Sequence, residues 1–313
     1  MKTFLLPHLI CPACLPAEIP LKIDRSREDR GDIVSGKLSC EKCRRIFPIR
    51  EGIAFLLIDP DSYRGGGQSR YDDTEMVNRY LWSHYADLAG VLSTGEANSA
   101  WAECLAETAT TALDTGCAVG RLTFEMGSRG RWAVGCDLSL NFVRMARLLA
   151  TERRCTFSLP LEGNLRESFS FELPEHLCSD TVEFVVANAQ ALPFARETFQ
   201  QTASVNLLDR VSYPLAHLYE MNRVAHKAGA SFLFADPFSW SAVSTPEDKW
   251  LGGTATGPYR GRGLDNVRSL LQGKDRIIAP VWNIIRETRI SWAMRTHTNH
   301  TEIITSEVLV STR

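Results

Sequence analysis

Four cysteines near the start of the chain are the clearest candidates for chemistry. They form two C-x-x-C pairs, Cys11 with Cys14 and Cys40 with Cys43. Each pair occupies a tight turn, so two pairs at this separation can direct four thiolates onto one tetrahedral zinc ion. A redox dithiol is the alternative, but it normally occurs as a single pair at a helix start. Because a four-cysteine site has no open coordination position, this zinc is predicted to fold its domain rather than to catalyse a reaction.

A second group of polar residues follows a series of apolar, strand-like runs. Asp114 opens the glycine-rich turn 114–121, and Asp137 ends the next apolar run. Glycine lets the backbone approach a ligand closely, and an acid about 20 residues after such a turn is placed to accept hydrogen bonds from two ribose hydroxyls. Two later runs end at Asn188 and Asn206. Because open α/β sheets bind ligands at the carboxyl ends of their strands, these residues predict a ligand site at that edge.

The elements that must position these residues change character along the chain. From residue 71 onward helix-like and strand-like segments alternate, which predicts an α/β fold, and Ser139 is placed to cap a helix over 140–150. The predicted strands are 132–137, 182–186, 202–206 and 231–235. Three consecutive glycines among polar residues at 59–70 are typical of a flexible linker. The predicted units are a cysteine-bearing domain, a linker and an α/β domain: 1–58, 59–70 and 71–313.

The overall composition is that of an ordinary globular protein, with 44% hydrophobic and 23% charged residues among 313. The net charge of −2 lacks the basic surplus of a general nucleic-acid binder. No stretch approaches the roughly 20 apolar residues of a membrane span, and the first apolar run is too short for a secretory signal. We therefore expect a cytoplasmic protein without a membrane partner, whose cysteines bind metal or stay free.

The first part of the chain resembles a known family of small proteins. The runs 9–14, 38–43 and 45–53 are similar to the zinc-binding activator subunit shared by several tRNA, rRNA and release-factor methyltransferases. The resemblance covers about residues 5–58. It implies a zinc ribbon that stabilises or activates a catalytic chain, and here that catalytic chain is fused to the ribbon.

The rest of the chain resembles the class I S-adenosylmethionine-dependent methyltransferases. Three motifs carry the resemblance: L-D-x-G-C-x-x-G-R at 113–121, G-x-D-x-S at 135–139 and A-x-x-L-P-F at 189–194. The resemblance covers about residues 71–313 and implies an enzyme with a Rossmann-like, seven-stranded sheet and S-adenosylmethionine as cofactor. The predicted cofactor-binding residues are Asp114, Gly116, Cys117, Gly120, Arg121, Asp137, Leu138, Asn188, Ala189 and Asn206.

The family's pattern implies a role for several of these residues. Asp114 and the turn glycines surround the methionine part, Asp137 holds the ribose, and Asn188 with Ala189 holds the adenine. Two positions depart from the pattern. Ala118 stands where many members have glycine, a change that is tolerable if its backbone dihedrals are ordinary. Asn188 stands where aspartate is usual, and its amide oxygen can still accept from the adenine amino group.

A narrower resemblance points to one kind of acceptor. The segments 80–85, 206–210, 245–253 and 284–289, together with Trp240 and the glycine-rich turn, are similar to the methyltransferase domain of ovothiol-pathway enzymes. That domain methylates a ring nitrogen of mercaptohistidine. The chain lacks the sulfur-transfer domain of those enzymes and carries a zinc ribbon instead. The resemblance implies a small heteroaromatic or amino-acid-like acceptor.

Candidate acceptor residues follow from this resemblance and from position. Asp209, at the end of a strand, is the predicted catalytic residue and would hold or deprotonate the acceptor; a salt bridge to Arg210 or a helix cap is the alternative. Arg286 and Glu287 are predicted to bind a carboxylate and an amine, or to form a structural ion pair. An aromatic pocket, placed in part on the lid-like segment 240–253, is predicted from three residues that otherwise fill the core: Tyr213, Trp240 and Trp250.

Two other functions compete with a small-molecule methyltransferase. The first is methylation of RNA or protein with the help of the zinc ribbon. The N-P-P-Y motif used on planar amides and amines is replaced by Asn206-Leu207-Leu208-Asp209, which argues against exocyclic nucleobase amines and glutamine side chains. The second is a non-catalytic scaffold that holds the cofactor without turnover, because one fold can host several functions.

Overall fold

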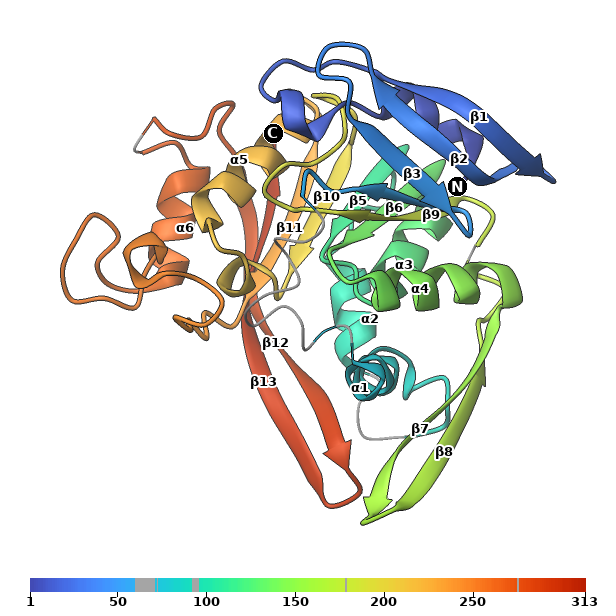
Figure 1. The fold of residues 1–313 in the computed structure, drawn as a ribbon. Helices are drawn as coiled ribbons and strands as arrows, with labels where there is room; N and C mark the ends of the chain where they lie inside the picture. Colours follow the sequence, from blue (N-terminus) through green and yellow to red (C-terminus); the bar gives the residue numbers. More distant parts are fainter. Residues whose placement is uncertain (60–70, 72, 92–95, 178, 275) are drawn as a thin grey trace.

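The computed structural model describes residues 1–59, 71, 73–91, 96–177, 179–274 and 276–313. Its central feature is one sheet of 11 strands that runs through the whole molecule (Figure 1). The strand order is β1-β2-β3-β4-β9-β6-β5-β10-β11-β13-β12. The first four strands belong to the cysteine-bearing segment, and the other seven confirm the predicted seven-stranded sheet.

The cysteine-bearing segment folds as two short 3-10 helices and an antiparallel meander. Its elements are η1 Thr3–His8, η2 Pro12–Cys14, β1 Leu21–Asp29, β2 Asp32–Cys40, β3 Ile46–Arg50 and β4 Ile53–Leu56. Alternate residues of β2 and β3 are buried, among them Leu38, Cys40 and Phe47, as the two-residue period of a half-buried strand requires. The predicted linker, 59–70, lies outside the described residues apart from Asp59.

In the seven-stranded part, five parallel strands lie next to one another, so their carboxyl ends share one edge of the sheet. Its strands are β5 Thr111–Thr115, β6 Trp132–Asp137, β9 Val182–Ala187, β10 Gln201–Val205, β11 Ser231–Asp236, β12 Asn283–His297 and β13 His300–Thr312. The first five of these pair in parallel, and β13 pairs antiparallel with both β11 and β12. The carboxyl ends of β9, β6, β5, β10 and β11 therefore lie side by side.

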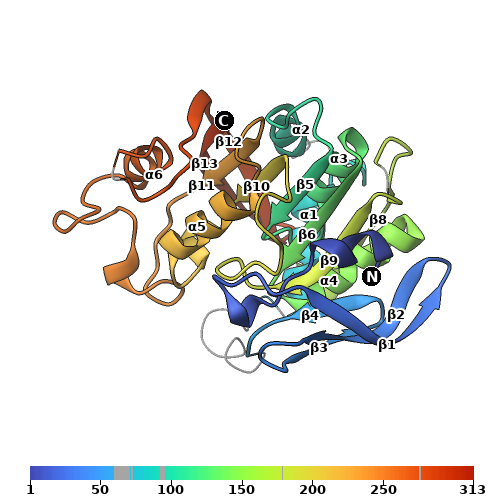
Figure 2. The ribbon, with the colours of Figure 1, turned by 90° about the horizontal axis from the view of Figure 1, so that it is seen from above.

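The two parts of the chain are joined into one sheet. Strand β4 pairs in parallel with β9, and Phe55 and Leu56 lie opposite Val186 and Ala187. Figures 1 and 2 place β1–β4 beyond the β9 edge, at the side of the molecule opposite α6. The ribbon thus covers what would otherwise be an exposed strand edge.

Helices cover both faces of the sheet. They are α1 Thr74–Tyr85, α2 Glu96–Glu103, α3 Arg121–Arg129, α4 Leu140–Glu152, α5 Pro214–Val224 and α6 Gly263–Leu271. One core contains side chains of α1–α4 and the other contains those of α5, α6 and the ribbon. Successive residues of β5 serve the two cores in turn, Ala112 one and Leu113 the other. Ser139 caps α4 as predicted, because its hydroxyl accepts from the amide of Phe142 at 3.3 Å.

Two hairpins extend from the body toward each other (Figure 1). One is formed by β7 Arg154–Glu162 and β8 Leu165–Glu172, and the other by β12 and β13. Arg295 on β12 pairs with Glu167 on β8 at 2.7 Å. Two short 3-10 turns, η4 Leu208–Arg210 and η5 Glu247–Lys249, complete the described elements used below. No helix in the described part of the chain is long and apolar enough to cross a membrane.

Candidate functional site

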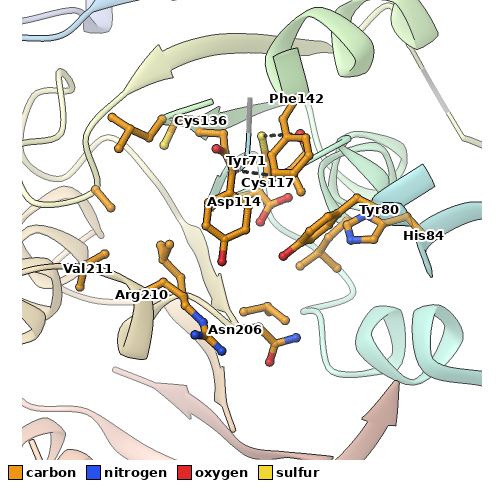
Figure 3. Close-up of a pocket in the computed structure, with 18 of the residues that line it drawn as sticks. Tyr71, Tyr80, His84, Asp114, Cys117, Cys136, Phe142, Asn206, Arg210 and Val211 are labelled. Carbon is orange, nitrogen blue, oxygen red and sulfur yellow. Dashed lines mark hydrogen bonds between the residues drawn. The ribbon is translucent and has the colours of Figure 1, made fainter. Parts of the chain in front are cut away.

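A cavity of about 450 Å³ opens at the carboxyl ends of β5, β6, β9 and β10 (Figure 3). We call its strand-end side the glycine-turn half; its residues are Asp114, Gly116, Cys117, Ala118, Asp137, Leu138, Asn188 and Ala189. We call the other side the cap half; its residues are His84, Asn98, Trp101, Asn206, Arg210 and Trp292. Tyr71, Tyr80 and Phe142 lie between the two halves as an aromatic cluster.

Two acids on neighbouring strands shape the glycine-turn half. Asp137 accepts from the amide of Ala118 at 3.0 Å and from the amide of Ser139 at 2.9 Å, so its carboxylate ties the turn to β6. Asp114 is buried and accepts from the hydroxyl of Thr123 at 2.7 Å. Burial, reinforced by the Asp137 carboxylate, raises the pKa of Asp114 to about 7. The site therefore contains one acid that is partly protonated at neutral pH.

The glycine-rich turn adopts left-handed backbone at several positions. Gly116 and Gly120 have φ of +77° and +87°. Ala118 has φ of +45°, so the assumption that its dihedrals are ordinary is wrong. A left-handed alanine costs about 1–2 kcal/mol because its Cβ crowds the following carbonyl. A Cβ on Gly120 would lie 2.8 Å from the ring of Phe184, so glycine is required there for packing as well.

The loop after β9 is held rigidly by its own side chains. The side-chain oxygen of Asn188 accepts from the amide of Gln190 at 2.9 Å, and the Gln190 oxygen accepts from the amide of Tyr213 at 2.8 Å. His217 bridges the carbonyl of Ala189, at 3.1 Å, and the hydroxyl of Ser204, at 2.7 Å. Burial lowers the pKa of His217 to about 4, so its ring is neutral and donates from Nδ1 to the carbonyl.

The structure brings together nearly all the predicted cofactor-binding residues. Nine line the cavity: Asp114, Gly116, Cys117, Arg121, Asp137, Leu138, Asn188, Ala189 and Asn206. Gly120 lies behind them at the start of α3. The guanidinium of Arg121 donates hydrogen bonds to Asp87, Glu125 and the carbonyl of His84. Burial raises the pKa of the Cys117 thiol well above its usual range, which agrees with a packing role.

Asp209, the predicted catalytic residue, lies behind the cavity wall. It is fully buried, and its Oδ2 accepts from the amide of Ser239 at 2.8 Å. Its Oδ1 lies 3.1 Å from Nε of Arg210, the ion pair that sequence reasoning held as the alternative. The η4 turn directs residue 209 inward and residue 210 toward the cavity. Arg210, rather than Asp209, is therefore the charged side chain that lines the site.

The predicted aromatic pocket residues also lie away from the cavity. Trp240 and Trp250 stack on each other with ring centroids 6.0 Å apart, and Nε1 of Trp250 donates to the carbonyl of Thr245 at 2.8 Å. Tyr213 is 53% exposed and lies against Lys249. Of the lid-like segment 240–253, only two described residues reach the cavity, Val243 and Ser244.

Arg286 and Glu287 do not form the predicted substrate clamp in this structure. Both carboxylate oxygens of Glu287 accept from Arg268 on α6, each at 2.7 Å, and Arg286 is exposed on β12. The cavity is reached farther along the same strand by Trp292. Residues 284–289, in the first part of β12, lie beside α6. Residues farther along β12 reach the cavity at the strand ends.

Sequence reasoning missed most of the cap half. His84 and Asn98 come from α1 and α2, and Asn98 donates to the His84 carbonyl at 2.9 Å. Trp292 donates to Ser306 at 3.1 Å, and Ser306 donates to Asn206 at 2.5 Å. The cap half thus unites four segments far apart in the chain. One available signal was the spacing of Tyr80 and His84, which places both on one face of a helix.

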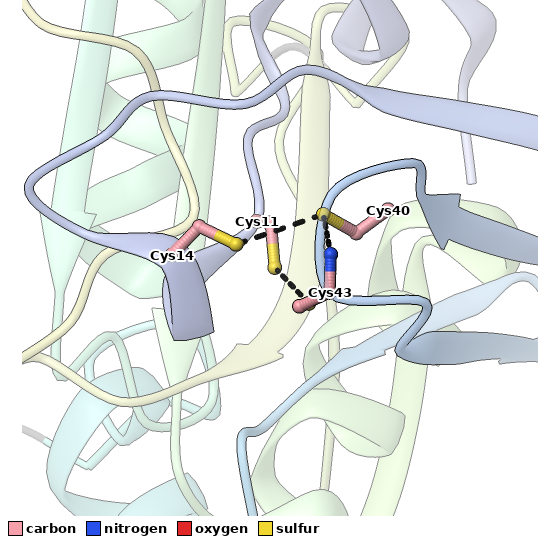
Figure 4. Close-up of side chains that lie close together, drawn as sticks. All are labelled: Cys11, Cys14, Cys40 and Cys43. Carbon is pink, nitrogen blue, oxygen red and sulfur yellow. Dashed lines mark hydrogen bonds between the residues drawn. The ribbon is translucent and has the colours of Figure 1, made fainter.

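The four N-terminal cysteines converge as predicted (Figure 4). All four sulfur atoms lie within 4.8 Å of one another, with Cys11 and Cys43 3.6 Å apart and Cys14 and Cys40 3.7 Å apart. Four soft thiolate ligands in a compact cluster fit a tetrahedral metal ion. The cluster is the metal-binding candidate found among the described residues.

The cysteine-bearing segment contacts the loop that follows the glycine-turn half. The amide of Ile10 donates to the carbonyl of Pro193 at 2.9 Å, and the amide of Ala195 donates to the carbonyl of His8 at 3.0 Å. Glu18 accepts from the amide of Arg196 at 3.0 Å. Residues next to a cysteine ligand are therefore bonded to the same loop that carries Asn188 and Ala189.

In comparisons with known families, the cysteine-bearing segment and the α/β segment match two different families. Residues 2–52 match the Trm112p-like protein family, and residues 113–233 match the methyltransferase domain family. The chain therefore contains a methyltransferase domain, preceded by a segment that matches the Trm112p-like family. The matched methyltransferase domain contains every strand that forms the glycine-turn half except the first residues of β5, and it ends within β11.

Several solved structures are similar to the chain at low identity. The YcgJ protein from Bacillus subtilis is 12% identical over 70% of this chain and 98% of that one, with a TM-score of 0.45. The complex of the Haloferax volcanii Trm112 methyltransferase activator with a putative methyltransferase is 15% identical over 57% and 60%, at 0.32. MccD protein is 19% identical over 45% and 53%, at 0.34, so the match spans about half of its length. No curated protein matches the methyltransferase.

Proposed function

We propose that the enzyme transfers a methyl group from S-adenosylmethionine to a ring nitrogen of a small, amino-acid-like heteroaromatic acceptor. The observation that carries the proposal is the cavity itself. Its volume of about 450 Å³ lies within the roughly 300–1,000 Å³ of small-molecule sites, and its cap half contributes indole and imidazole rings. The resemblance of 80–85 and 206–210 to mercaptohistidine methyltransferases supports the same class of acceptor.

The glycine-turn half has the donors and acceptors that the cofactor requires. We assign the ribose hydroxyls to Asp137, the methionine part to Asp114 and Gly116, and the adenine to Leu138, Asn188 and Ala189. S-adenosylmethionine supplies an activated methyl group on its sulfonium. The residues fit because two carboxylates and a left-handed glycine turn face one cavity, next to the aromatic cluster.

The cap half orients the acceptor and excludes water. Methyl transfer from a sulfonium is an in-line displacement, so the protein must align the acceptor lone pair with the methyl carbon. A neutral ring nitrogen already carries that lone pair and needs no general base. Burial, assisted by Arg121, lowers the pKa of His84 to about 3, so this ring presents a neutral surface to the acceptor. Trp101 and Trp292 supply flat surfaces against which a ring can stack.

A macromolecular acceptor is the second candidate, and the Trm112p-like match favours it. Lys42, Arg44 and Arg45 are exposed at or beside the second cysteine pair and could contact RNA or an acidic peptide. In that case the ribbon would present the acceptor, in addition to holding the loop at Pro193. We favour the small acceptor because the cavity is lined by rings from α1, α2 and β12.

A pair of tryptophan variants tests the assignment of the cap half. We expect Trp292→Leu to lower kcat/KM for a mercaptohistidine-type acceptor about two- to tenfold, because aromatic stacking is worth about 0.5–1.5 kcal/mol beyond the buried area. Trp250→Leu, off the cavity, is the matched control and should change kcat/KM little. Thermal unfolding and cofactor affinity, measured on both variants, separate acceptor binding from loss of folding.

Acceptor identity is tested with labelled cofactor. The enzyme is incubated separately with mercaptoimidazole and histidine derivatives, with bulk tRNA and with a protein extract, and the labelled product is identified by mass. Methylation confined to the small compounds supports the proposal. Efficient methylation of tRNA or protein, with none of the small compounds converted, would replace it with the second candidate.

A further inference from the structure

Arg210 lies between the cap half of the cavity and two buried acids, Asp209 and Asp236. Arg210 follows β10 in the η4 turn, lines the cavity and is 29% exposed. Figure 3 shows its guanidinium end turned toward the cavity and toward Asn206. A guanidinium carries five N–H donors in a planar fork, which matches the geometry of a carboxylate.

The position of Arg210 is set from behind by Asp209. Oδ1 of this fully buried carboxylate lies 3.1 Å from Nε of Arg210, and its Oδ2 accepts from the amide of Ser239. Asp236 lies next to it and accepts from the amide of Asp209 at 3.2 Å. Burial, together with the neighbouring Asp209 carboxylate, raises the pKa of Asp236 well above its usual range. Asp209 therefore orients the guanidinium through Nε, the nitrogen nearest the backbone.

The other charged residues that line the cavity have different partners. Among the described lining residues, Arg121 and Glu125 are paired with each other, and Arg121 is also paired with Asp87. Asp114 and Asp137 belong to the glycine-turn half. His84 is neutral, as its lowered pKa of about 3 requires. Among the described residues of the cap half, Arg210 is the cation whose guanidinium end is turned toward the cavity.

The strand order separates Arg210 from the ribose and adenine positions. Strands β6 and β9, which carry Asp137 and Asn188, lie on one side of β5, whereas β10 lies on the other side. A ligand group held by Arg210 therefore lies beyond the glycine-rich turn, where the acceptor must approach the methyl group. The rings of Trp101 and Trp292 in the same half select a flat molecule.

We propose that Arg210 binds the carboxylate of the acceptor and that Asp209 is a positioning residue for it, an inference that rests on the proposed function above. The acceptor is then a heteroaromatic molecule that retains its amino-acid carboxylate. Its decarboxylated amine should be a poor ligand. The anchor fixes one end of the acceptor while the aromatic side chains of the cap half fix the plane of its ring.

The test measures binding before turnover, so that it does not depend on finding the natural acceptor. Histidine and histamine, and mercaptohistidine and mercaptohistamine, are titrated by calorimetry into the full chain loaded with S-adenosylhomocysteine. We expect each carboxylated probe to bind at least tenfold more tightly than its amine. Arg210→Gln should abolish this preference without changing cofactor affinity, and Arg210→Lys should restore part of it.

Two further variants control for structure. Arg286→Gln removes an exposed arginine off the cavity and should retain the full preference. Asp209→Asn should weaken carboxylate binding at least threefold and leave binding of the amine probes and the cofactor unchanged, which a merely structural role would not do. Circular dichroism identifies any variant that fails to fold, and Arg210→Lys then carries the test.

The outcomes separate the two proposals. Equal affinity of wild-type protein for a carboxylated probe and its amine would overturn the anchor. A tenfold loss of cofactor affinity in Arg210→Gln, with the probe preference retained, would assign Arg210 to the cofactor's own carboxylate instead. If the preference is found and depends on Arg210 but no small acceptor is methylated, the anchor stands and the proposed function fails.

Discussion

The two halves of the cavity differ in how the chain builds them. The glycine-turn half comes from short runs of consecutive residues, each at the end of a strand. Its contacts lie within one run, as for Asn188 with Gln190, or join the ends of adjacent strands, as for Ala118 with Asp137. The cap half is assembled from α1, α2, β10 and β12. One of its hydrogen bonds joins Ser306 to Asn206 across the sheet.

This difference decides which residues a sequence can reveal. In the glycine-turn half, residue type and spacing encode the geometry, because strand ends and turn glycines set the local backbone. In the cap half a side chain reaches the cavity only if a long hairpin and two helices dock correctly. Trp292 does reach it, while Arg286, on the same strand, does not. Four predictions test this contrast, from the largest expected effect to the smallest.

Metal removal should act on the glycine-turn half through the ribbon. Structural zinc contributes about 10–16 kcal/mol to the folding of small zinc domains, so a chelator or Cys11→Ser with Cys40→Ser should unfold residues 1–58. The loop bonded to Ile10 through Pro193 would then lose its support. We expect cofactor affinity to fall at least tenfold, measured by calorimetry, together with a lower melting temperature.

The control for this experiment is Cys104→Ser, a buried cysteine outside the cluster. It should leave metal content and cofactor affinity near wild type. Elemental analysis of protein purified without chelators should give one zinc per chain. Metal-free protein with four reactive thiols and full cofactor affinity would contradict the prediction.

Asp137→Ala should weaken cofactor binding at least tenfold. Hydrogen bonds to a charged group are worth about 1.5–3 kcal/mol each, and the variant loses two of them to the ribose. Asp265→Ala, an exposed acid on α6, is the matched control. Isothermal calorimetry compares the two variants. Unchanged affinity in Asp137→Ala would place the ribose elsewhere. The glycine-turn half would then no longer be assigned to the cofactor.

Asp114 should make cofactor affinity depend on pH. Because its pKa is raised from 3.8 to about 7, the carboxyl is protonated in the free protein below pH 7 and cannot pair with the methionine ammonium. We expect affinity to rise about tenfold per pH unit below that value and to level off above it. Asp114→Asn should show a flat profile between pH 5 and 8, a window in which His84 and His217 stay neutral.

The same shift affects stability with the opposite sign. A carboxyl whose pKa is raised on folding binds more protons in the folded state, so the free energy of unfolding should fall as pH rises from about 4 to 7. Above pH 7 this contribution is constant. Urea unfolding of wild type and Asp114→Asn measures it. A steeper wild-type loss of stability above pH 7 would assign the effect to another group.

Ala118→Gly should stabilise the free protein by up to about 1 kcal/mol. Relief of the left-handed alanine exceeds the entropy that glycine loses on folding. Ala150→Gly is the control, because it lies in the last turns of helix α4 and should cost about 1 kcal/mol. Denaturant titration distinguishes the two signs. A loss of stability in Ala118→Gly would mean that its Cβ packs favourably within the turn.

Residue type and spacing by themselves determined the cysteine cluster, the strand-end acids and the cap of α4. Cys11, Cys14, Cys40 and Cys43 converge because each C-x-x-C turn is local, and Ser139 caps α4 because the cap lies three residues from its partner. The seven-stranded sheet followed from the resemblance of its motifs, and the structure confirms that it has seven strands.

Only the tertiary structure decided which side chains face the acceptor. Whether residue 209 or 210 points into the cavity depends on how the η4 turn is placed after β10. Whether Arg286 or Trp292 reaches the cavity depends on where the long hairpin crosses the strand ends. The pairing of β4 with β9, which makes the ribbon and the methyltransferase one sheet, is likewise long-range. A residue's type fixes what it can bind, but contacts between distant segments fix the direction in which it points.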